Sequence, residues 1–295
     1  MKILVTGATG FIGQNLVKLL LNKNYEIHAI IKLNSNSSKI DKRARIFKYD
    51  ENIDVLIKYF NKENFDGVIH LASLFLASHT SKDIANLINS NIRFGTELLE
   101  ACKESNVQWF LNTGTFWQNY NNEKYNPVNL YAATKEAFEA IAKFYTETSD
   151  LIFTTVKLND TFGPDDTRNK VFNLWNKIAK TGEMLDMSKG EQIIDISYIE
   201  DVINAYHVLI EHLNSNKKET FKNKTYVIES KERISLQELS KIFEEATNKK
   251  LNINWGAREY REREVMIPFE NGELVPGWEQ KYTLISAIQR TIGEN

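Results

Sequence analysis

The sequence is poor in cysteine and has no excess of either charge. Its 295 residues contain one cysteine, Cys102, and 37 basic against 39 acidic side chains, which gives a formal net charge of −2. A single cysteine excludes an internal disulfide and any zinc site built mainly on cysteine, and we expect no metal site. The charge balance argues against a dedicated nucleic-acid-binding protein, which normally carries a strongly basic domain.

Long apolar runs and targeting signals are also missing. No stretch approaches the roughly 20 apolar residues that a membrane-spanning helix needs, and the first residues show no charged segment followed by a hydrophobic run. Hydrophobic residues nevertheless make up 42% of the chain and aromatic residues 11%, which is enough for a packed core. We therefore expect a globular protein of a reducing compartment, most simply the cytoplasm, without a nucleic-acid or membrane partner.

Short apolar runs typical of strands alternate with stretches of helical spacing through the first half of the chain. This alternation predicts βαβ units and therefore an α/β fold, a Rossmann-like, doubly wound parallel sheet with helices on both faces. The predicted strands are residues 2–6, 26–32, 45–49, 66–72, 107–112 and 152–158. The predicted helices are residues 13–22, 53–61, 84–105, 130–148 and 171–180. Later helices at 235–248 and 283–292 indicate a smaller C-terminal lobe on the strand ends.

A glycine-rich turn follows the first predicted strand and opens the first predicted helix. Residues 6–13 read TGATGFIG, which is the fingerprint of a dinucleotide-binding site in this context. Gly7 permits a tight turn, Gly10 lets the backbone approach a pyrophosphate, and Gly13 allows close packing of helix on strand. Free N–H groups at the helix N-terminus would attract the phosphates. We expect cofactor contacts from Gly7, Thr9, Gly10, Phe11, Ile12 and Gly13.

The end of the second predicted strand indicates which dinucleotide binds. An acid there hydrogen-bonds the 2′-hydroxyl of NAD, whereas a basic residue accommodates the 2′-phosphate of NADP. Here the strand ends in Lys32, and no carboxylate follows until Asp41. The sequence therefore favours NADP, with NAD as the alternative. Asp50, at the end of the third strand, is a candidate for the adenine end and equally for an acid at a helix N-terminus.

Tyr131 and Lys135 lie four residues apart on the predicted helix 130–148, so they share one face. A tyrosine with an ordinary pKa near 10 is a poor proton-transfer group at neutral pH. A nearby ammonium favours the phenolate, and we expect it to lower the pKa of Tyr131. Thr113 and Thr115 follow the preceding strand, and either hydroxyl could hold a substrate oxygen.

With these motifs the chain resembles an extended short-chain dehydrogenase/reductase, from the group of nucleotide-sugar epimerases, dehydratases and reductases. The resemblance covers nearly the whole chain. It implies an NADP-binding domain of residues 1–165 with about 193–230, and a nucleotide-sugar-binding lobe of residues 166–192 with 231–295. The matching segments are residues 6–13, HLAS at 70–73, NIRFGT at 91–96, YAATK at 131–135, FGP at 162–164 and DISYIEDV at 195–202.

The resemblance also implies a role for each matching position. Thr115 would be the catalytic hydroxyl, Tyr131 the acid/base, and Lys135 the residue that binds the ribose and tunes the tyrosine, with Asn91 beside them. Arg261 would bind the diphosphate, a task that suits its planar and always-charged fork. Further cofactor contacts would come from Leu71, Ala72 and Ser73, and substrate contacts from Ser73, Thr115, Phe116, Asp160 and Arg261.

Departures from the family pattern fall mainly on the substrate side. Thr113, Gly114 and Thr115 stand where the family often has serine, serine, and then serine or threonine. Asp160 replaces an asparagine, and Ile194 replaces an arginine.

The residues after Thr115 reduce the number of reactions that the chain could catalyse. A 4,6-dehydratase of this family carries Asp-Glu there, whereas this chain has Phe116 and Trp117, which cannot transfer protons. Ketone reduction at C4 and 4-epimerisation remain, because both need only the threonine, tyrosine and lysine. Lys32 favours NADPH and hence reduction. The segments 112–118 and 126–131 are similar to reductases of nucleotide-linked 4-keto-6-deoxyhexoses, such as the abequose and paratose synthases that make rare deoxysugars for surface polysaccharides.

Two other interpretations stay open. One is an NAD-dependent nucleotide-sugar 4-epimerase, and the other is a non-catalytic NADP-binding regulator, although such regulators typically lose the tyrosine–lysine pair. The base could be that of a CDP-, dTDP- or GDP-sugar. As in the family, residues 84–105 and 130–148 are long enough to form a homodimer through a four-helix bundle.

Overall fold

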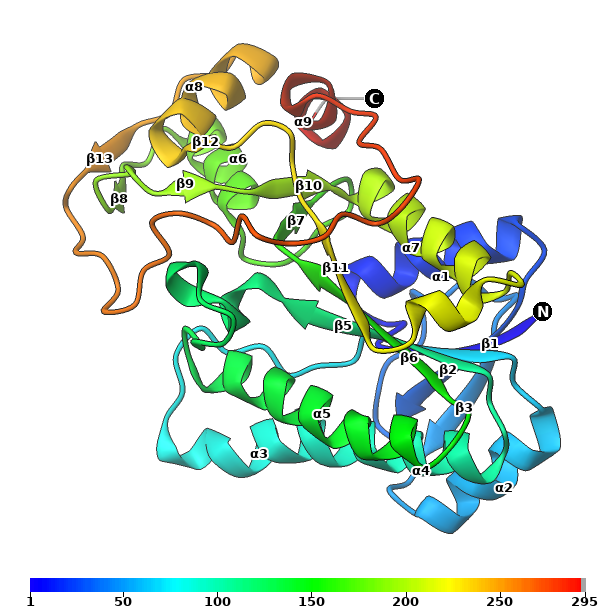
Figure 1. Ribbon diagram of the computed structural model, residues 1–295. Coiled ribbons are helices and arrows are strands. Elements are labelled where there is room, and N and C mark those ends of the chain that lie inside the picture. Colours follow the sequence, from blue (N-terminus) through cyan, green and yellow to red (C-terminus); the bar gives the residue numbers. More distant parts are fainter. Residues whose placement is uncertain (293–295) are drawn as a thin grey trace.

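The computed structural model describes residues 1–292 of the chain (Figure 1). Its central feature is a seven-stranded sheet in the order β11-β6-β5-β4-β1-β2-β3, and every neighbouring pair is parallel. The predicted α/β, doubly wound fold is therefore confirmed. The strands are β1 (Lys2–Thr6), β2 (Glu26–Lys32), β3 (Arg45–Tyr49), β4 (Gly67–His70), β5 (Trp109–Thr115), β6 (Ile152–Leu158) and β11 (Lys224–Ile228).

Helices cover both faces of this sheet (Figure 1). On one face lie α1 (Phe11–Asn22) and α7 (Ile199–Leu213), and on the other α2 (Ile53–Glu63), α4 (Phe94–Glu104) and α5 (Leu130–Glu147). The apolar side chains of β1 alternate between the two cores: Ile3 and Val5 join the first, and Leu4 joins the second. A strand buried on both faces needs apolar residues at consecutive positions, which explains the unbroken run at the start of the chain.

The order of the strands locates the binding crevice. From β1 the chain moves outward to β2 and β3, and then returns to β4 on the opposite side of β1. In open parallel sheets, ligands bind outside the carboxyl ends of the strands at such a reversal. Thr6 and His70 end β1 and β4 at this place.

The C-terminal lobe is built on three small sheets, of which two are parallel pairs and one is antiparallel. Its core continues the apolar cluster of the α1 and α7 face, with Phe172, Trp175 and Phe243 packed together. The division into two domains stays a prediction. The lobe's elements, with the short pairs at its base, are β7 (Asp160–Phe162), α6 (Val171–Thr181), β8 (Leu185–Met187), β9 (Ile193–Ile194), β10 (Ile196–Tyr198), β12 (Ile234–Ser235), α8 (Leu236–Thr247), β13 (Ile253–Trp255) and α9 (Leu284–Ile292).

The predicted helix 84–105 is wrong in one respect. It is split into α3 (Ile84–Ile88), a π-helical turn η2 (Asn89–Arg93), and α4. The wider turn holds the buried side chain of Asn91 among polar partners, and such turns are frequent at functional sites. The short 3-10 segments are η1 (Ser81–Asp83), η3 (Phe116–Gln118), η4 (Tyr120–Asn122) and η5 (Lys218–Phe221).

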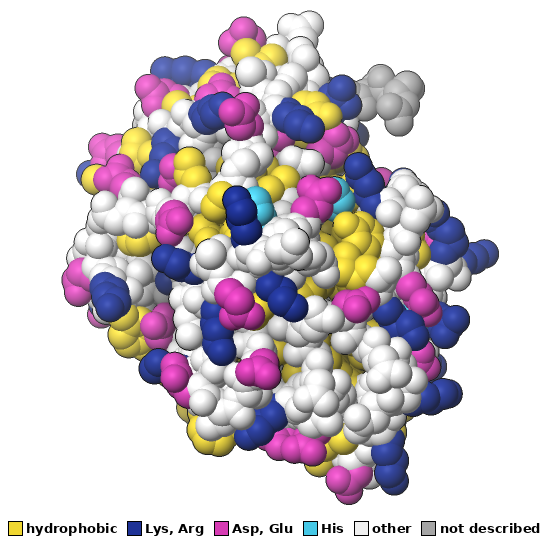
Figure 2. All heavy atoms as spheres, turned by 45° about the vertical axis from the view of Figure 1, so that its right-hand side comes forward, with side chains coloured by type: hydrophobic (Ala, Val, Ile, Leu, Met, Phe, Trp, Pro, Cys, Tyr) yellow, Lys and Arg dark blue, Asp and Glu magenta, His cyan; other side chains and the backbone are white. Residues whose placement is uncertain are grey.

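The surface view adds the distribution of charge. Figure 2 shows basic and acidic side chains interspersed over one face of the molecule. This mixture agrees with the small net charge. Within residues 1–292, no helix combines the length and the apolar character needed to cross a bilayer.

Candidate active site

The glycine turn joins β1 to α1 in a conformation that side chains would disturb. Gly7 has φ +68°, and a Cβ there would lie 2.7 Å from the backbone nitrogen of Ala72. A Cβ on Gly13 would overlap the carbonyl oxygen of Gly7. Gly10 is the N-cap of α1 and has no side chain to satisfy the first N–H groups of that helix. The turn therefore presents backbone donors and a bare surface, which fits the pyrophosphate of a dinucleotide.

A cavity of about 340 Å³ extends from this turn across the ends of β2, β3 and β4. It brings together seven of the predicted cofactor residues, namely Gly7, Thr9, Gly10, Lys32, Leu71, Ala72 and Ser73. Sequence reasoning missed other lining residues, among them Ser35, Tyr49, Glu51, Arg93 and Glu97. The last four come from segments that only the folded sheet brings together.

Several predicted cofactor residues lie elsewhere. Asp50 does not line the cavity, and its carboxylate accepts a hydrogen bond from the backbone nitrogen of Asn52 at the start of α2. The ring of Phe11 lies under the Arg168 guanidinium, 4.5 Å from centroid to Cζ. Ile12 packs against the core, and Gly13 is buried under the turn.

Thr6 and His70 fix the loop that follows β4. The Thr6 Oγ1 accepts hydrogen bonds from the backbone nitrogens of Leu71 and Ala72, at 3.1 and 2.9 Å. Its one proton is then donated to His70 Nδ1, at 3.0 Å, which assigns the imidazole proton to Nε2. Burial lowers the pKa of His70 well below its usual value, with Lys135 acting in the same direction. His70 is thus a neutral structural residue.

Tyr131 lies in the first turn of α5, which Asn129 caps by accepting a hydrogen bond from the Ala132 nitrogen. The side chains of Ser73 and Thr115 lie near its hydroxyl. Burial raises the pKa of Tyr131 to about 12, and these two contacts act in the opposite direction. The expectation of a lowered pKa is wrong for the protein chain itself, because burial outweighs the neighbouring groups. Tyr131 is therefore protonated at neutral pH, and a positive charge close to its hydroxyl would make it a stronger proton donor.

Lys135 lies one helical turn beyond Tyr131 and is 3% exposed. Burial lowers the pKa of Lys135 to about 8, while the charge of Glu139 acts in the opposite direction. The ammonium is present below that pH and is lost as the pH rises through it. A cation brought close to the phenol would stabilise the phenolate that forms when Tyr131 gives up its proton.

This pKa sets the expected pH dependence of a reaction in which Tyr131 donates its proton. We expect kcat/KM to stay constant at neutral pH and to fall above about pH 8, as Lys135 loses its charge while Tyr131 stays protonated. Steady-state rates between about pH 6 and 10 measure this. Lys135→Arg is the control, because its guanidinium keeps the charge and any remaining activity should lack the decline. An unchanged rate at pH 9 in the unmodified protein would contradict the assignment.

Asn91 connects two parts of the site through its side-chain amide. Its Oδ1 accepts hydrogen bonds from the Leu74 nitrogen at 2.7 Å and the Ser73 hydroxyl at 3.2 Å. Its Nδ2 donates to the Leu74 carbonyl and to Thr134 Oγ1, at 3.1 and 2.9 Å. These contacts tie the loop after β4 to α5, so Asn91 positions Ser73 and Tyr131. The contacts are those of a positioning residue.

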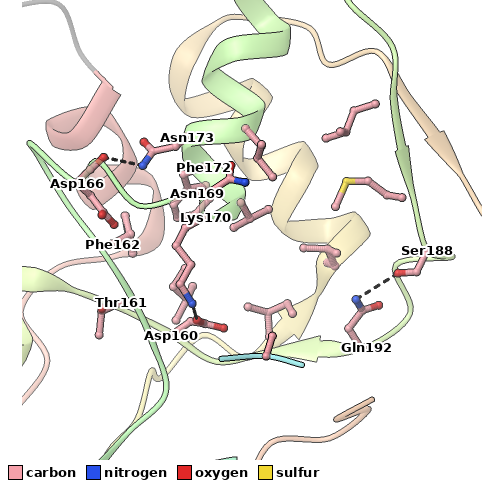
Figure 3. A pocket seen from close by; sticks show the side chains of 18 of the residues that line it. Asp160, Thr161, Phe162, Asp166, Asn169, Lys170, Phe172, Asn173, Ser188 and Gln192 are labelled. Atoms are coloured by element: carbon pink, nitrogen blue, oxygen red, sulfur yellow. Dashed lines mark hydrogen bonds and ion pairs between the residues drawn. The ribbon is translucent and has the colours of Figure 1, made fainter. Parts of the chain in front are cut away.

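A second cavity, of about 490 Å³, lies between the strand ends and the lobe (Figure 3). Predicted substrate residues Asp160 and Arg261 both line it. Lys170, which sequence reasoning missed, points into the cavity and donates to Asp160 Oδ1 at 2.7 Å (Figure 3). Phe116 lines an adjoining cavity of about 150 Å³ that shares Asp160 and Arg261 with the larger one. The second cavity therefore combines apolar, acidic and basic side chains, and its basic side chains can bind an anionic group of a ligand.

Tyr131 itself lines neither cavity, but residues close to it line both. On one side it contacts Ser73, which lines the cofactor cavity. On the other side its ring stands edge-on to Phe75, at 5.1 Å, and Phe75 and Trp117 line the second cavity. A proton donor in this position could protonate the oxygen of a carbonyl group whose carbon faces a nicotinamide.

Known proteins of similar sequence and structure act on nucleotide sugars. The chain is 27% identical to CDP-abequose synthase of Salmonella typhimurium, over 98% of this chain and 97% of the relative. It is 26% identical to UDP-glucuronate 4-epimerase 1 of Arabidopsis thaliana, over 74% of this chain and 56% of that protein.

The fold is also that of a UDP-glucose 4-epimerase from Thermotoga maritima, with a TM-score of 0.86 and 21% identity over 99% of this chain and 97% of that one. The match to a family rests on the sequence from β1 to β11. Residues 3–228 match the NAD dependent epimerase/dehydratase family, and the chain belongs to this family of nucleotide-sugar enzymes.

Proposed function

We propose that the protein reduces the C4 ketone of a nucleotide-linked 4-keto-6-deoxyhexose with NADPH. The observation that carries this proposal is the place of Tyr131, a protonated phenol with neighbours that line the dinucleotide cavity and neighbours that line the second cavity, where Lys170, Arg258 and Arg261 stand among acidic side chains. Phe116 and Trp117 follow Thr115 without adding a proton-transfer group. Proton donation to one oxygen is then the chemistry that remains for these residues.

A bound nicotinamide supplies the hydride that reduces the C4 carbon. Tyr131 donates its proton to the oxygen that becomes the hydroxyl, and Thr115 holds that oxygen by a hydrogen bond. Lys135 stabilises the phenolate left on Tyr131 until a solvent proton restores it. Ser73, beside Tyr131, keeps the hydroxyl aimed at the substrate.

The substrate's diphosphate would lie among the basic side chains of the second cavity. Lys170, Arg258 and Arg261 all line it, and each can donate charge-assisted hydrogen bonds to phosphate oxygens. The pairing of Lys170 with Asp160 offsets the charge introduced where the family has an asparagine. The names of the relatives favour a CDP-linked sugar, and the apolar side chains of Phe116 and Trp117 suit a methyl group at C6.

NADPH rather than NADH is proposed because Lys32 lines the cofactor cavity together with Ser35. We expect Lys32→Glu to lower the preference for NADPH over NADH by about tenfold to hundredfold, because it removes a charge-assisted hydrogen bond and adds a carboxylate facing the 2′ position. Dissociation constants from fluorescence titration with both cofactors measure the change. Lys224→Glu, on the exposed end of β11, is the control. An unaltered preference in Lys32→Glu would place the 2′-phosphate elsewhere.

A 4-epimerase is the second candidate, because relatives with that name share the family and the same three groups suffice for it. Purified protein mixed with NADPH and CDP-, dTDP- or GDP-linked 4-keto-6-deoxyhexose separates the candidates. Loss of NADPH absorbance with formation of the 4-hydroxy sugar supports the reductase. Interconversion of two nucleotide sugars without net use of cofactor would identify the epimerase. Tight NADP binding without either reaction would indicate a regulator.

The functional unit proposed is a homodimer in the cytoplasm. Exposed apolar side chains on α3 and α5, including Ile84, Ile88 and Phe144, lie on the helices that form a four-helix bundle in the family. The contacts within one chain leave these three side chains 39–58% exposed.

A further inference from the structure

Gln118 is a fully buried polar residue directly behind the catalytic threonine. It ends the short segment η3, which Thr115 begins as its N-cap. The side-chain oxygen of Gln118 accepts a hydrogen bond from the backbone nitrogen of Thr115, at 2.9 Å. The Thr115 hydroxyl in turn accepts from the backbone nitrogen of Trp117, at 3.4 Å. Gln118 and Thr115 thus fix each other reciprocally at the end of β5.

The amide nitrogen of Gln118 reaches the helix that carries the other catalytic groups. It donates to Glu136 Oε2 at 2.6 Å and to Glu139 Oε1 at 3.0 Å. Both carboxylates belong to α5, the helix of Tyr131 and Lys135. One side chain therefore bridges the strand end to α5 through three hydrogen bonds, two of them to charged acceptors, which are the stronger kind.

The neighbouring residues leave room for this bridge and balance its charge. A Cβ on Gly114 would lie 2.9 Å from the Gln118 side-chain oxygen, so glycine stands where the family often has a serine. Lys157 and Lys135 supply positive charge near Glu139. Lys157 is itself buried and donates to Asn119 at 2.7 Å. The bridge is satisfied at every polar atom and fits only a neutral donor–acceptor side chain.

We propose that Gln118 is a positioning residue that holds Thr115 at the correct distance from Tyr131 by tying the end of β5 to α5. This inference rests on the proposed function, in which both hydroxyls converge on one substrate oxygen. Misplacement of a catalytic group by about 1 Å can cost about a hundredfold in rate. Gln118 itself touches neither cavity.

Two substitutions of Gln118, and a double variant that also changes Glu139, test the bridge. Gln118→Met keeps the shape and removes all three hydrogen bonds, so we expect kcat to fall by about tenfold to hundredfold while the KM for NADPH changes less than about twofold. Gln118→Glu replaces the donor by a third carboxylate and should lose at least as much. Adding Glu139→Gln exchanges amide and carboxylate, restores one bridge hydrogen bond, and should recover about tenfold in kcat over Gln118→Glu alone. Gln108→Met, exposed before the start of β5, is the control.

Amide hydrogen exchange provides a readout that needs no substrate. In Gln118→Met, the Thr115 amide should exchange at least about tenfold faster, while the amides in the middle of α5 keep their rates. If Gln118→Met fails to fold, the bridge is tested instead by comparing Gln118→Glu with the double variant that also carries Glu139→Gln. An unchanged Thr115 amide, an unchanged kcat, or a double variant no better than Gln118→Glu would overturn the proposal. If the wild-type protein were inactive on every sugar tested, the proposed function would be wrong. Amide hydrogen exchange of Thr115 would still test whether Gln118 holds the end of β5.

Discussion

Replacing Tyr131 by phenylalanine is expected to lower kcat for ketone reduction by about 10²–10⁴-fold, the usual contribution of a general acid. The phenylalanine ring keeps the edge-on contact with Phe75, and Lys135 and Thr115 keep their places. The variant loses only the proton that the substrate oxygen needs, so NADPH affinity should change little. Initial rates at saturating NADPH and sugar, with a separate titration of the cofactor, measure both quantities.

The matched control for this substitution is Tyr145→Phe. Tyr145 lies near the other end of α5, and its hydroxyl donates to Glu100 at 2.8 Å, away from the cofactor cavity and the second cavity. It should retain turnover within about twofold. A Tyr131→Phe variant with unaltered kcat would remove the phenol from the mechanism and, with it, the reason for proposing a reductase.

Gly13→Ala is expected to have the largest effect on the cofactor side. Its Cβ would overlap the Gly7 carbonyl and lie 2.8 Å from the Ala8 Cα, and both are backbone atoms that cannot rotate away. Forcing an extra carbon into a packed place typically costs about 1–3 kcal/mol of stability. Because the turn must open, NADPH affinity should fall at least about tenfold. Thermal unfolding and fluorescence titration measure the two losses.

Gly10→Ala separates these two effects. A Cβ on Gly10 would meet only the Gly7 carbonyl, at 3.3 Å, and its backbone conformation suits any residue. Stability should therefore change little, whereas the added carbon faces the expected pyrophosphate and should weaken NADPH binding. Gly13→Ala protein as stable as the wild type would show that the tight contact of α1 on its strand is not needed.

The strands show how far apolar patterning carries a prediction. β3 and β6 have the predicted bounds, and in both a polar residue, Asp50 or Asn159, follows the last residue of the strand. β11 was missed because its first two residues are exposed and polar, which leaves only three apolar positions. The π-helical turn was missed because its flanking residues keep helical spacing, and a local widening by one residue does not disturb that pattern.

The residues of the candidate site likewise fall into those that the sequence could predict and those that it could not. Tyr131, Lys135 and Thr115 could be predicted because they belong to local motifs at the ends of predictable elements. Lys170 and Gln118 could not, because their partners lie 10 and 18–21 residues away and only the fold brings them together. The direction of the Tyr131 pKa also depends on burial, which a spacing of four residues does not reveal.

The apolar cluster that runs from α1 and α7 into the lobe limits how far the lobe can move when a substrate binds. Phe172, Trp175 and Phe243 belong to the same cluster as Leu16 and Leu209, so the lobe has no core of its own on which to swing. In the proposed reductase, a diphosphate bound by the lobe would therefore be held in a fixed position relative to the C4 carbon that receives the hydride. Binding energy from the nucleotide would then help to align the sugar carbon with the nicotinamide.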